Sequence, residues 1–332
     1  MSEIQKPAAL GMGNALVDIL MPVENDQILF ELDLPKGSMT LVDEVKAKTI
    51  LQRTAGLEKS YASGGSAANT IHGIASMGMS SGYIGSIGKD DLGKTFRNSM
   101  ESRGVQMYLN HAPVSTGYAI TFITPDGERT FGTYLGAATH LKPEYLPTEN
   151  FPAYSLLHVE GYLIIEYDLL HKTLDMAKKS GLKVSYDLAS YNVVEANREQ
   201  TQTILENYVD IIFANEEEAT AFTGKPPGEA LDELARLCDI AVVKLGKDGS
   251  MANHENEIFS VPAVPADPLD TTGAGDLYAS GFIYGFLKGF TPEQCLKTGS
   301  LLAGKVIEVM GSKLGEDNWK QIHDGISQIL ED

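Results

Sequence analysis

Short apolar runs alternate with longer segments of helical periodicity along most of the chain. The apolar runs have the length of buried strands, and helical patterns follow several of them. The predicted strands are Ala8–Leu16, Leu156–Val159, Leu182–Leu188, Val209–Ala214 and Ile240–Leu245, and the predicted helices include Ser66–Met77, Leu169–Lys179 and Glu216–Thr223. This alternation predicts an α/β fold whose parallel sheet is covered by helices on both faces.

Residues 116–136 show a different pattern. Two strand-like runs, Tyr118–Thr124 and Arg129–Leu135, flank the turn sequence Pro-Asp-Gly-Glu, which predicts a hairpin in a separate antiparallel piece. Together with residues 21–40, the hairpin is expected to form a small β lid over the carboxyl ends of the parallel strands, where open α/β sheets bind ligands. The sequence has no repeat and no clear interdomain linker, so we expect one unit over residues 1–332.

Composition narrows the class of protein. The chain has 26 Lys and Arg against 45 Asp and Glu, a net charge of -19, which argues against nucleic-acid or membrane partners. The amino-terminal residues do not resemble a signal peptide, and no apolar run is long enough to cross a membrane, which favours a cytoplasmic protein. Cys238 and Cys295 lie in segments with helical patterns and form no ligand-like cluster, so we expect neither a disulfide nor a zinc site.

The strongest chemical signal is Asp270-Thr271-Thr272-Gly273-Ala274-Gly275-Asp276, followed at once by a helical pattern. Its glycines allow a tight turn that exposes backbone N–H groups at a helix start, where the helix dipole favours anions. Asp276 adds a carboxylate beside this anion cradle. Proton abstraction from an alcohol that attacks a bound phosphoryl group gives a reason for that carboxylate, whereas phosphate binding alone does not. A shorter GAGD match would often be only a turn with a helix cap.

This motif resembles the signature of the ribokinase family of carbohydrate and nucleoside kinases, also called the phosphofructokinase B family. Residues 13–19, GNALVDI, and 64–70, GGSAANT, follow the family's order and resemble its adenosine-kinase-like branch. The resemblance implies a ribokinase-like three-layer sandwich with a central, mostly parallel sheet and a small β lid. It also implies that Asp276 is the catalytic base and that the N–H groups of Gly273, Ala274 and Gly275 stabilise charge on the transferred phosphoryl group.

Two earlier segments carry the residues that the family uses for its acceptor. One follows the first strand, and the other is a glycine turn that enters a helix. From the residues alone, the first is equally an ordinary turn. The resemblance assigns the hydroxyl groups of the acceptor to Asn14, Asp18, Gly64, Gly65 and Asn69.

The nucleotide side is expected near two later strand ends. Asn215 and Glu218 alone would indicate an acidic helix start. The resemblance implies that they organise Mg²⁺ and the triphosphate of ATP, largely through water. The turn Gly246–Gly249 is either a plain hairpin or a close approach to the nucleotide, and the resemblance places Lys244 and Gly246, with Gly249 in the same turn, near ATP.

The resemblance also matches Asp270 and Thr272 to part of a potassium site that the family often has. The remaining ligands of that site have no clear match in the sequence around residues 306–315. Potassium is therefore an expectation from the motif residues alone.

Glu160 departs from the adenosine-kinase pattern. Adenosine kinases tend to have a small residue there and an aromatic residue near Leu163, whereas ribokinases have a Glu that binds sugar hydroxyls. A carboxylate is costly against a purine face but accepts charge-assisted hydrogen bonds from hydroxyl groups. The expected function is ATP-dependent phosphorylation of the primary hydroxymethyl group of a furanose, with a free sugar favoured and adenosine or another nucleoside as the alternative.

Other readings find less support. A nicotinamide-dependent oxidoreductase would need a GxGxxG turn, and residues 11–16 lack its third glycine. A catalytically silent sugar sensor would lack the carboxylate of Asp276. Residues 299–306 match the GxxxxGK part of a P-loop but end in Val306 and lie in a helical pattern. The oligomeric state stays open between a monomer and a homodimer formed through the lid.

Overall fold

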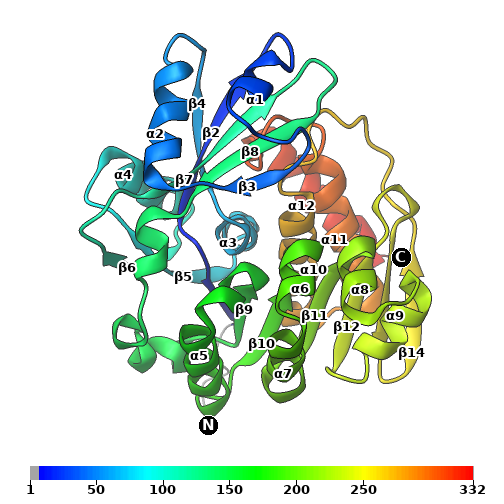
Figure 1. Ribbon diagram of the computed structural model, residues 1–332. Coiled ribbons are helices and arrows are strands. Elements are labelled where there is room, and N and C mark those ends of the chain that lie inside the picture. The colour runs from blue at the N-terminus through cyan, green and yellow to red at the C-terminus, as the bar shows by residue number, and fades with distance from the viewer. Residues whose placement is uncertain (1–6, 332) are drawn as a thin grey trace.

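The computed structural model describes residues 7–331. These residues form a large sheet of nine strands and a small sheet of five. Figure 1 shows the small sheet at the top, above the helices that cover the large sheet. Residues 1–6 and 332, the ends of the unit expected from the sequence, lie outside the described residues.

The large sheet has the strand order β14-β13-β12-β11-β10-β9-β1-β5-β6. All neighbours from β12 to β6 are parallel, and only the β12–β13 and β13–β14 pairs are antiparallel. The strands are β1 (Ala8–Met12), β5 (Ser80–Ile87), β6 (Gln106–His111), β9 (Leu156–Glu160), β10 (Lys183–Asp187), β11 (Ile211–Asn215), β12 (Ile240–Lys244), β13 (Ser250–His254) and β14 (Glu257–Val261). The predicted α/β class with a mostly parallel sheet is confirmed.

Helices cover both faces of this sheet and bury two separate cores. Neighbouring residues of β1 point to opposite faces of the sheet and so belong to different cores. Ala9 lies in the core under α3, α4, α10, α11 and α12, and Leu10 lies in the core under α5 to α9. The helices are α3 (Ser66–Ser76), α4 (Asp91–Glu101), α5 (Tyr167–Lys179), α6 (Tyr191–Ala196), α7 (Arg198–Tyr208), α8 (Glu216–Thr223), α9 (Pro227–Leu234), α10 (Ala274–Lys288), α11 (Pro292–Val306) and α12 (Glu316–Glu331). The predicted three-layer sandwich is confirmed.

The small sheet has the order β3-β8-β7-β2-β4. Its strands are β2 (Leu16–Pro22), β3 (Met39–Leu41), β4 (Ser60–Gly64), β7 (Gly117–Ile123) and β8 (Arg129–Tyr134), and its outer face packs on α1 (Gln27–Glu31) and α2 (Glu44–Arg53). The predicted β7–β8 hairpin is present. The sheet is mixed, however, because β2 pairs with β7 and β3 pairs with β8 in parallel, so the expectation of an antiparallel piece was wrong.

The run Ala8–Leu16 is not one strand, as the sequence predicted. The chain leaves the large sheet after Met12 and enters the small sheet at Leu16. Gly13 lies at this change of direction, against the carboxylate of Glu160 and the side chain of Ala67, where an added Cβ would collide with both. A contact that is distant in sequence therefore ends the strand, and the apolar run itself carries no sign of it.

Several smaller expectations also have an outcome. Cys295 lies in α11 and is buried, but Cys238 follows α9 and is only partly buried, so its predicted helical position was wrong. Both cysteines are free thiols. Residues 299–306 lie inside α11 rather than in a strand-to-helix loop, which agrees with dismissing the P-loop. Among residues 7–331, no helix is long and apolar enough to cross a membrane.

Candidate active site

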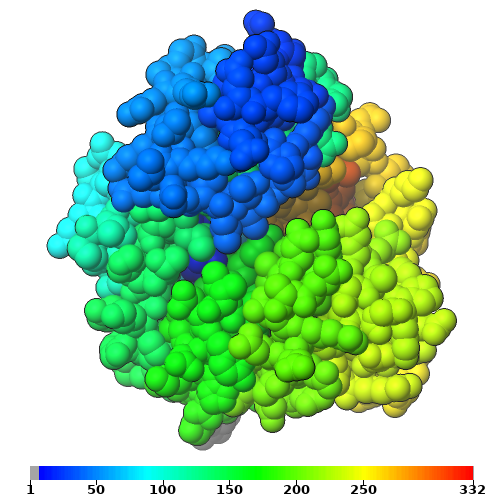
Figure 2. All heavy atoms as spheres, in the orientation of Figure 1, coloured from blue at the N-terminus to red at the C-terminus, as the bar shows by residue number. Residues whose placement is uncertain are grey.

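A polar cavity of about 580 Å³ lies between the small sheet and the carboxyl ends of the parallel strands. Figure 2 shows the surface hollowed between the blue segments of the small sheet and the green segments below them. The cavity is lined by Asp18, Gly65, Ser66, Asn69, Phe131, Tyr162, Asp187, Ala189, Asn215, Glu216, Glu217, Glu218, Lys244, Gly246, Thr272, Gly275 and Asp276. The acceptor, nucleotide and base segments singled out in the sequence therefore meet at one place.

The glycine motif forms the expected loop at a helix start. Gly273 has a φ of 73° and lies directly before α10, so the chain turns there in the left-handed region that glycine adopts without strain. The N–H of Ala274 donates to the carbonyl of Thr271 at 3.3 Å. The N–H groups of the first turn of α10 have no partner within the helix and lie at the positive end of its dipole. The tight turn at a helix start that the sequence predicted is therefore present.

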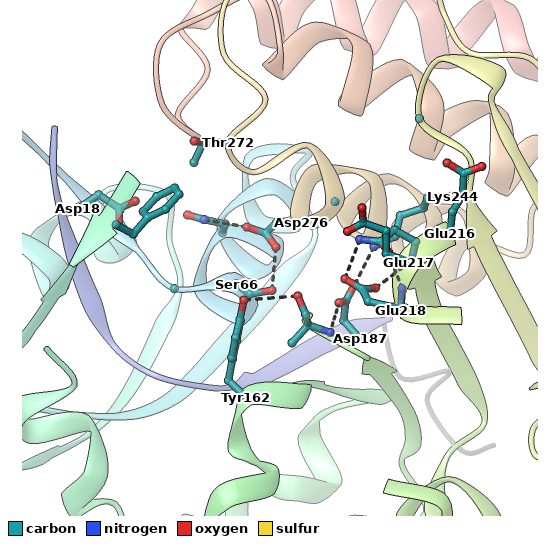
Figure 3. A pocket seen from close by; sticks show the side chains of 17 residues that line it. Asp18, Ser66, Tyr162, Asp187, Glu216, Glu217, Glu218, Lys244, Thr272 and Asp276 are labelled. Carbon is teal, nitrogen blue, oxygen red and sulfur yellow. Dashed lines mark hydrogen bonds and ion pairs between the residues drawn. The ribbon is translucent and has the colours of Figure 1, made fainter. Parts of the chain in front are cut away.

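Asp276 is held by two side chains of α3. The Oγ of Ser66 donates to Oδ1 at 2.7 Å, and the Nδ2 of Asn69 donates to Oδ2 at 2.9 Å (Figure 3). Burial raises the pKa of Asp276 above its ordinary value, although these two hydrogen bonds oppose the shift. A fixed carboxylate with a raised pKa is a suitable proton acceptor.

The predicted acceptor residues lie around the same space. Asp18, on β2, lines the polar cavity, and burial raises its pKa to about 6 although Lys313 lowers it. Gly65 lies directly before α3. Gly64 ends β4, and a Cβ added to Gly64 would collide with the Asp18 carboxylate. Asn14 does not line this cavity but an adjoining apolar one. Three elements thus bring the acceptor segments together.

Both carboxylate oxygens of Glu160 accept hydrogen bonds from other residues of the protein. Its Oε1 accepts from the backbone N–H and the Nδ2 of Asn14, at 2.9 and 2.7 Å, and its Oε2 accepts from the N–H of Ala67 at 2.9 Å. The residue is 1% exposed, and burial raises its pKa to about 7 against the effect of these bonds. Glu160 thereby ties the end of β9 to the β1–β2 link and to the start of α3.

The adjoining cavity, of about 230 Å³, is largely apolar. It shares Gly65, Ser66, Phe131 and Tyr162 with the polar cavity. Its other walls are Asn14, Leu16, Met39, Leu41, Thr133, Leu135, Glu160, Ile165 and Val193. Most of the apolar walls come from the small sheet, so that sheet encloses a space suited to a flat, apolar group.

On the nucleotide side, Asn215 and Glu218 cap α8. The N–H and Nδ2 of Asn215 donate to Glu218, and the N–H of Glu218 donates back to Oδ1 of Asn215, each at 2.8 Å. Burial raises the pKa of Glu218 to about 7, with a further contribution from Asp187. Asn215 and Glu218 therefore both cap α8 and line the polar cavity.

A second apolar cavity, of about 570 Å³, adjoins the polar one on the far side of the glycine motif. It is lined by Lys244, Gly246, Lys247, Gly249, Ala263, Val264, Pro265, Ala266, Pro268, Thr271, Ala274, Gly275, Tyr278, Ser300, Ala303, Gly304 and Ile307. Gly246–Asp248 is a short 3-10 turn that joins the antiparallel strands β12 and β13. The two sequence interpretations of this turn are therefore compatible, since a hairpin turn lines a cavity of nucleotide size.

Carboxylate side chains lie along one wall of the polar cavity. Asp187, Glu216, Glu217 and Glu218 place carboxylates along the polar cavity near Lys244, whose Nζ donates to Asp187 at 2.9 Å (Figure 3). Mg²⁺ prefers oxygen ligands, keeps several waters and is often bound through one or two carboxylates and the substrate phosphates. Among residues 7–331, no group of three or more His, Cys, Asp or Glu is arranged to hold a metal ion.

Asp270, which the resemblance matches to part of a potassium site, is bonded within the protein. Its Oδ1 accepts from the N–H of Thr272 at 2.6 Å and pairs with the guanidinium of Arg129, while Oδ2 accepts from the N–H of Gly311 at 2.7 Å. A carboxylate has about four lone-pair positions, and three of them are engaged here, so the potassium site stays a prediction. The side chain of Arg129 links β8 of the small sheet to the glycine motif.

Sequence reasoning missed five residues around the base: Ser66, Phe131, Tyr162, Asp187 and Lys313. Asp187 had a readable signal, since it ends a buried strand at the edge where parallel sheets bind ligands. Ser66 lies within a motif that was already singled out. Phe131 and Tyr162 look like ordinary sheet and loop residues, and Lys313 lies in a loop without any pattern.

Comparison with known proteins defines the class. Residues 41–319 match the model of the pfkB family carbohydrate kinases. A 5-dehydro-2-deoxygluconokinase of Bacillus velezensis is 31% identical over 260 residues, which cover 74% of this chain and 79% of that protein. The chain belongs to the pfkB family of carbohydrate kinases, and it is a kinase. The expected membership of the ribokinase family is confirmed.

Two solved structures resemble nearly the whole chain. A probable sugar kinase from Rhizobium etli has a TM-score of 0.91 and 32% identity, and covers 98% of this chain and 100% of its own. The adenosine kinase from Sinorhizobium meliloti has a TM-score of 0.89 and 34% identity, and covers 96% of this chain and 99% of its own. Sugar kinases and adenosine kinases are therefore both among its relatives.

Proposed function

We propose that this kinase transfers the γ-phosphoryl group of ATP to the primary hydroxyl of a purine nucleoside. The observation that carries the proposal is the apolar cavity walled by Leu16, Met39, Leu41 and Phe131 beside Asp276. A purine is a flat apolar body that such walls accommodate, whereas the hydroxyls of a free sugar would lose water there without gaining hydrogen bonds.

The bonds of Glu160 remove the main reason for favouring a free sugar. Its two oxygens accept three hydrogen bonds from Asn14 and Ala67. In the proposal, Glu160 orients the Asn14 amide, and Asn14 with Asp18 then binds the ribose hydroxyls. The carboxylate borders the apolar cavity, but its hydrogen bonds go to Asn14 and Ala67, so it acts on the acceptor through Asn14.

In the proposed mechanism, Asp276 accepts the proton of the primary hydroxyl as the hydroxyl oxygen attacks the γ-phosphorus, and the bond between the γ-phosphorus and the β–γ bridging oxygen breaks to release ADP. The N–H groups of Gly273, Ala274 and Gly275 stabilise the charge on the transferred phosphoryl group. The second apolar cavity, next to Gly246 and Gly249, takes the adenine of ATP. Glu218 would hold Mg²⁺ through water, and that ion would neutralise charge on the phosphates.

A free furanose is the second candidate, because the curated relatives include 5-dehydro-2-deoxygluconokinases, which their name places among sugar kinases. The polar cavity around Asp18 and Asn69 would serve such an acceptor as well. In that case the apolar cavity would stay outside the substrate contacts.

The deciding experiment is ATP turnover by the purified enzyme with adenosine, guanosine, cytidine, ribose, fructose and 5-dehydro-2-deoxygluconate at equal concentrations. We expect kcat/KM for the preferred purine nucleoside to exceed that for every free sugar by at least about 100-fold, because the base adds roughly 3 kcal/mol of apolar contact. Turnover of a free sugar at a rate equal to or above the nucleosides would reject the proposal.

A further inference from the structure

A lysine outside the predicted site contacts the amide that holds the base. Lys313 lies in the loop between α11 and α12, and its Nζ donates to Oδ1 of Asn69 at 2.8 Å. The Oγ of Ser312 donates to the same oxygen at 2.9 Å. Asn69 is itself 4% exposed, so these contacts replace water on the amide oxygen.

The other end of the same amide faces the base. The Nδ2 of Asn69 donates to Oδ2 of Asp276 at 2.9 Å. A lysine ammonium can only donate hydrogen bonds, so it fixes the amide with its oxygen toward the loop and its NH2 group toward the carboxylate. One charged group thereby determines the orientation of the donor that contacts Asp276.

The charge of Lys313 also suits this place. Burial, the largest effect, and Arg103 lower the pKa of Lys313 to about 8, while the charges of Asp18 on β2 and Asp276 on α10 oppose this shift. The lysine in turn lowers the pKa of Asp18. A cation that interacts with both carboxylates reduces their repulsion and favours the ionised form that a base requires.

We propose that Lys313 is a positioning residue for phosphoryl transfer, which acts through Asn69 to hold the Asp276 carboxylate toward the acceptor hydroxyl. The inference rests on the proposed role of Asp276 as the base. Lys313 itself lines none of the three cavities assigned to the acceptor and ATP, so its loss should affect the chemical step more than nucleotide binding.

Three single variants test the lysine. Lys313→Met removes the ammonium and keeps most of the stem, and we expect kcat to fall about 10- to 100-fold while KM for ATP changes less than about threefold. Lys313→Arg keeps a charged donor and should hold kcat within about tenfold of wild type. Lys305→Met is the matched control, since Lys305, near the end of α11, pairs with Glu308 just beyond the helix and lines none of the three cavities.

A double-mutant cycle tests the route through Asn69. If Lys313 acts through this amide, adding Lys313→Met to Asn69→Ala lowers kcat by less than about twofold. Losses that multiply in the double variant overturn the inference, and so does a wild-type kcat in Lys313→Met. If Lys313→Met melts below the assay temperature, Lys313→Gln, which retains a hydrogen-bond donor but no charge, replaces it in the cycle.

Asp276→Asn is assayed beside these variants with the best acceptor of the substrate panel. A low kcat in Asp276→Asn together with a wild-type kcat in Lys313→Met rejects the positioning role of Lys313 and leaves Asp276 as the base. A wild-type kcat in Asp276→Asn rejects the base and the inference with it. The choice between nucleoside and sugar affects only which acceptor the assay uses.

Discussion

Glu160 and Asn14 are joined by two hydrogen bonds, one to the backbone N–H and one to the side-chain amide of Asn14. The pair connects the end of a large-sheet strand to the segment that leads into the small sheet. A residue that resembles a sugar ligand in the sequence is thus a buried anchor for another residue of the site.

Replacing Glu160 by Gln should weaken the acceptor site. An amide offers one acceptor oxygen where the carboxylate accepts three hydrogen bonds, so Asn14 loses its fixed orientation. We expect kcat/KM to fall at least tenfold for adenosine and by a similar factor for ribose, with KM for ATP unchanged. A loss confined to free sugars would instead indicate direct contact with a sugar hydroxyl. Glu199→Gln, an exposed carboxylate on α7, is the control.

Asp276→Asn should lower kcat by about 10²- to 10⁴-fold, the usual contribution of a general base. The amide keeps the shape and can still contact Ser66 and Asn69, so ATP binding and melting temperature should change little. Steady-state kinetics, nucleotide titration and thermal melting measure the three quantities. A kcat near that of wild type would show that the proton leaves by another route.

Phe131→Ala should separate the two acceptor classes. Phe131 lines both the polar and the smaller apolar cavity, where a purine would lie. Loss of its ring should raise KM for adenosine about tenfold or more and leave KM for ribose within about twofold. Phe30→Ala is the matched control, because Phe30 lies on α1, the helix that packs on the same small sheet, and is 83% exposed. Equal effects on both acceptors would mean that the apolar cavity holds no base.

The stability of the free enzyme should depend on Asp18. Burial raises the pKa of Asp18 from 3.8 to about 6. A carboxyl group whose pKa rises on folding stabilises the folded protein fully at pH values below the pKa that the group has in the unfolded chain. This stabilisation is lost as pH rises through the pKa that the group has in the folded protein, here between about pH 4 and 6. Asp18→Asn should therefore melt about 2 to 4 °C higher than wild type at pH 7.5 and no higher near pH 4. Thermal melts without ligand test this, and a difference that is independent of pH would contradict it.

Acceptor binding should order the segments predicted as a lid, residues 21–40 and 116–136. Closure over the acceptor would exclude water and limit wasteful ATP hydrolysis. Amide hydrogen exchange in both segments should slow with the true acceptor but not with ATP alone. Exchange in α12, which packs on α11 and belongs to neither segment, serves as the internal reference. If neither segment responds to the acceptor, the small sheet is a fixed wall of the site.

Local sequence patterns were sufficient for the class of fold. Strand–helix alternation predicted the large sheet, and the turn after Thr124 predicted the β7–β8 hairpin. The break inside Ala8–Leu16 could not be predicted in this way, because it depends on Glu160 and Ala67, which are far away in the sequence. The parallel pairing of β2 with β7 is equally non-local.

The residues of the site fall into the same two groups, those that local sequence patterns indicate and those that only the folded chain brings together. Residues within short motifs, such as Gly273 and Asp276, could be singled out because their spacing alone indicates chemistry. Phe131 and Lys313 reach the same space from separate elements, and only the folded chain brings them beside the motif residues. Glu160 was singled out in the sequence as a sugar ligand, but its partners in the structure are Asn14 and Ala67, which tertiary packing and not its neighbours in sequence brings to it.

The interleaving of the two sheets has a consequence for synthesis on the ribosome. Residues 16–64 supply β2, β3 and β4, while β7 and β8 come from a second segment, and β2 pairs with β7 from a position roughly 100 residues earlier in the chain. At about 5 to 20 residues per second, translation takes about 5 to 20 s to cover that distance. During this interval β2 has an unpaired edge, which is where nascent sheets pair wrongly with other chains.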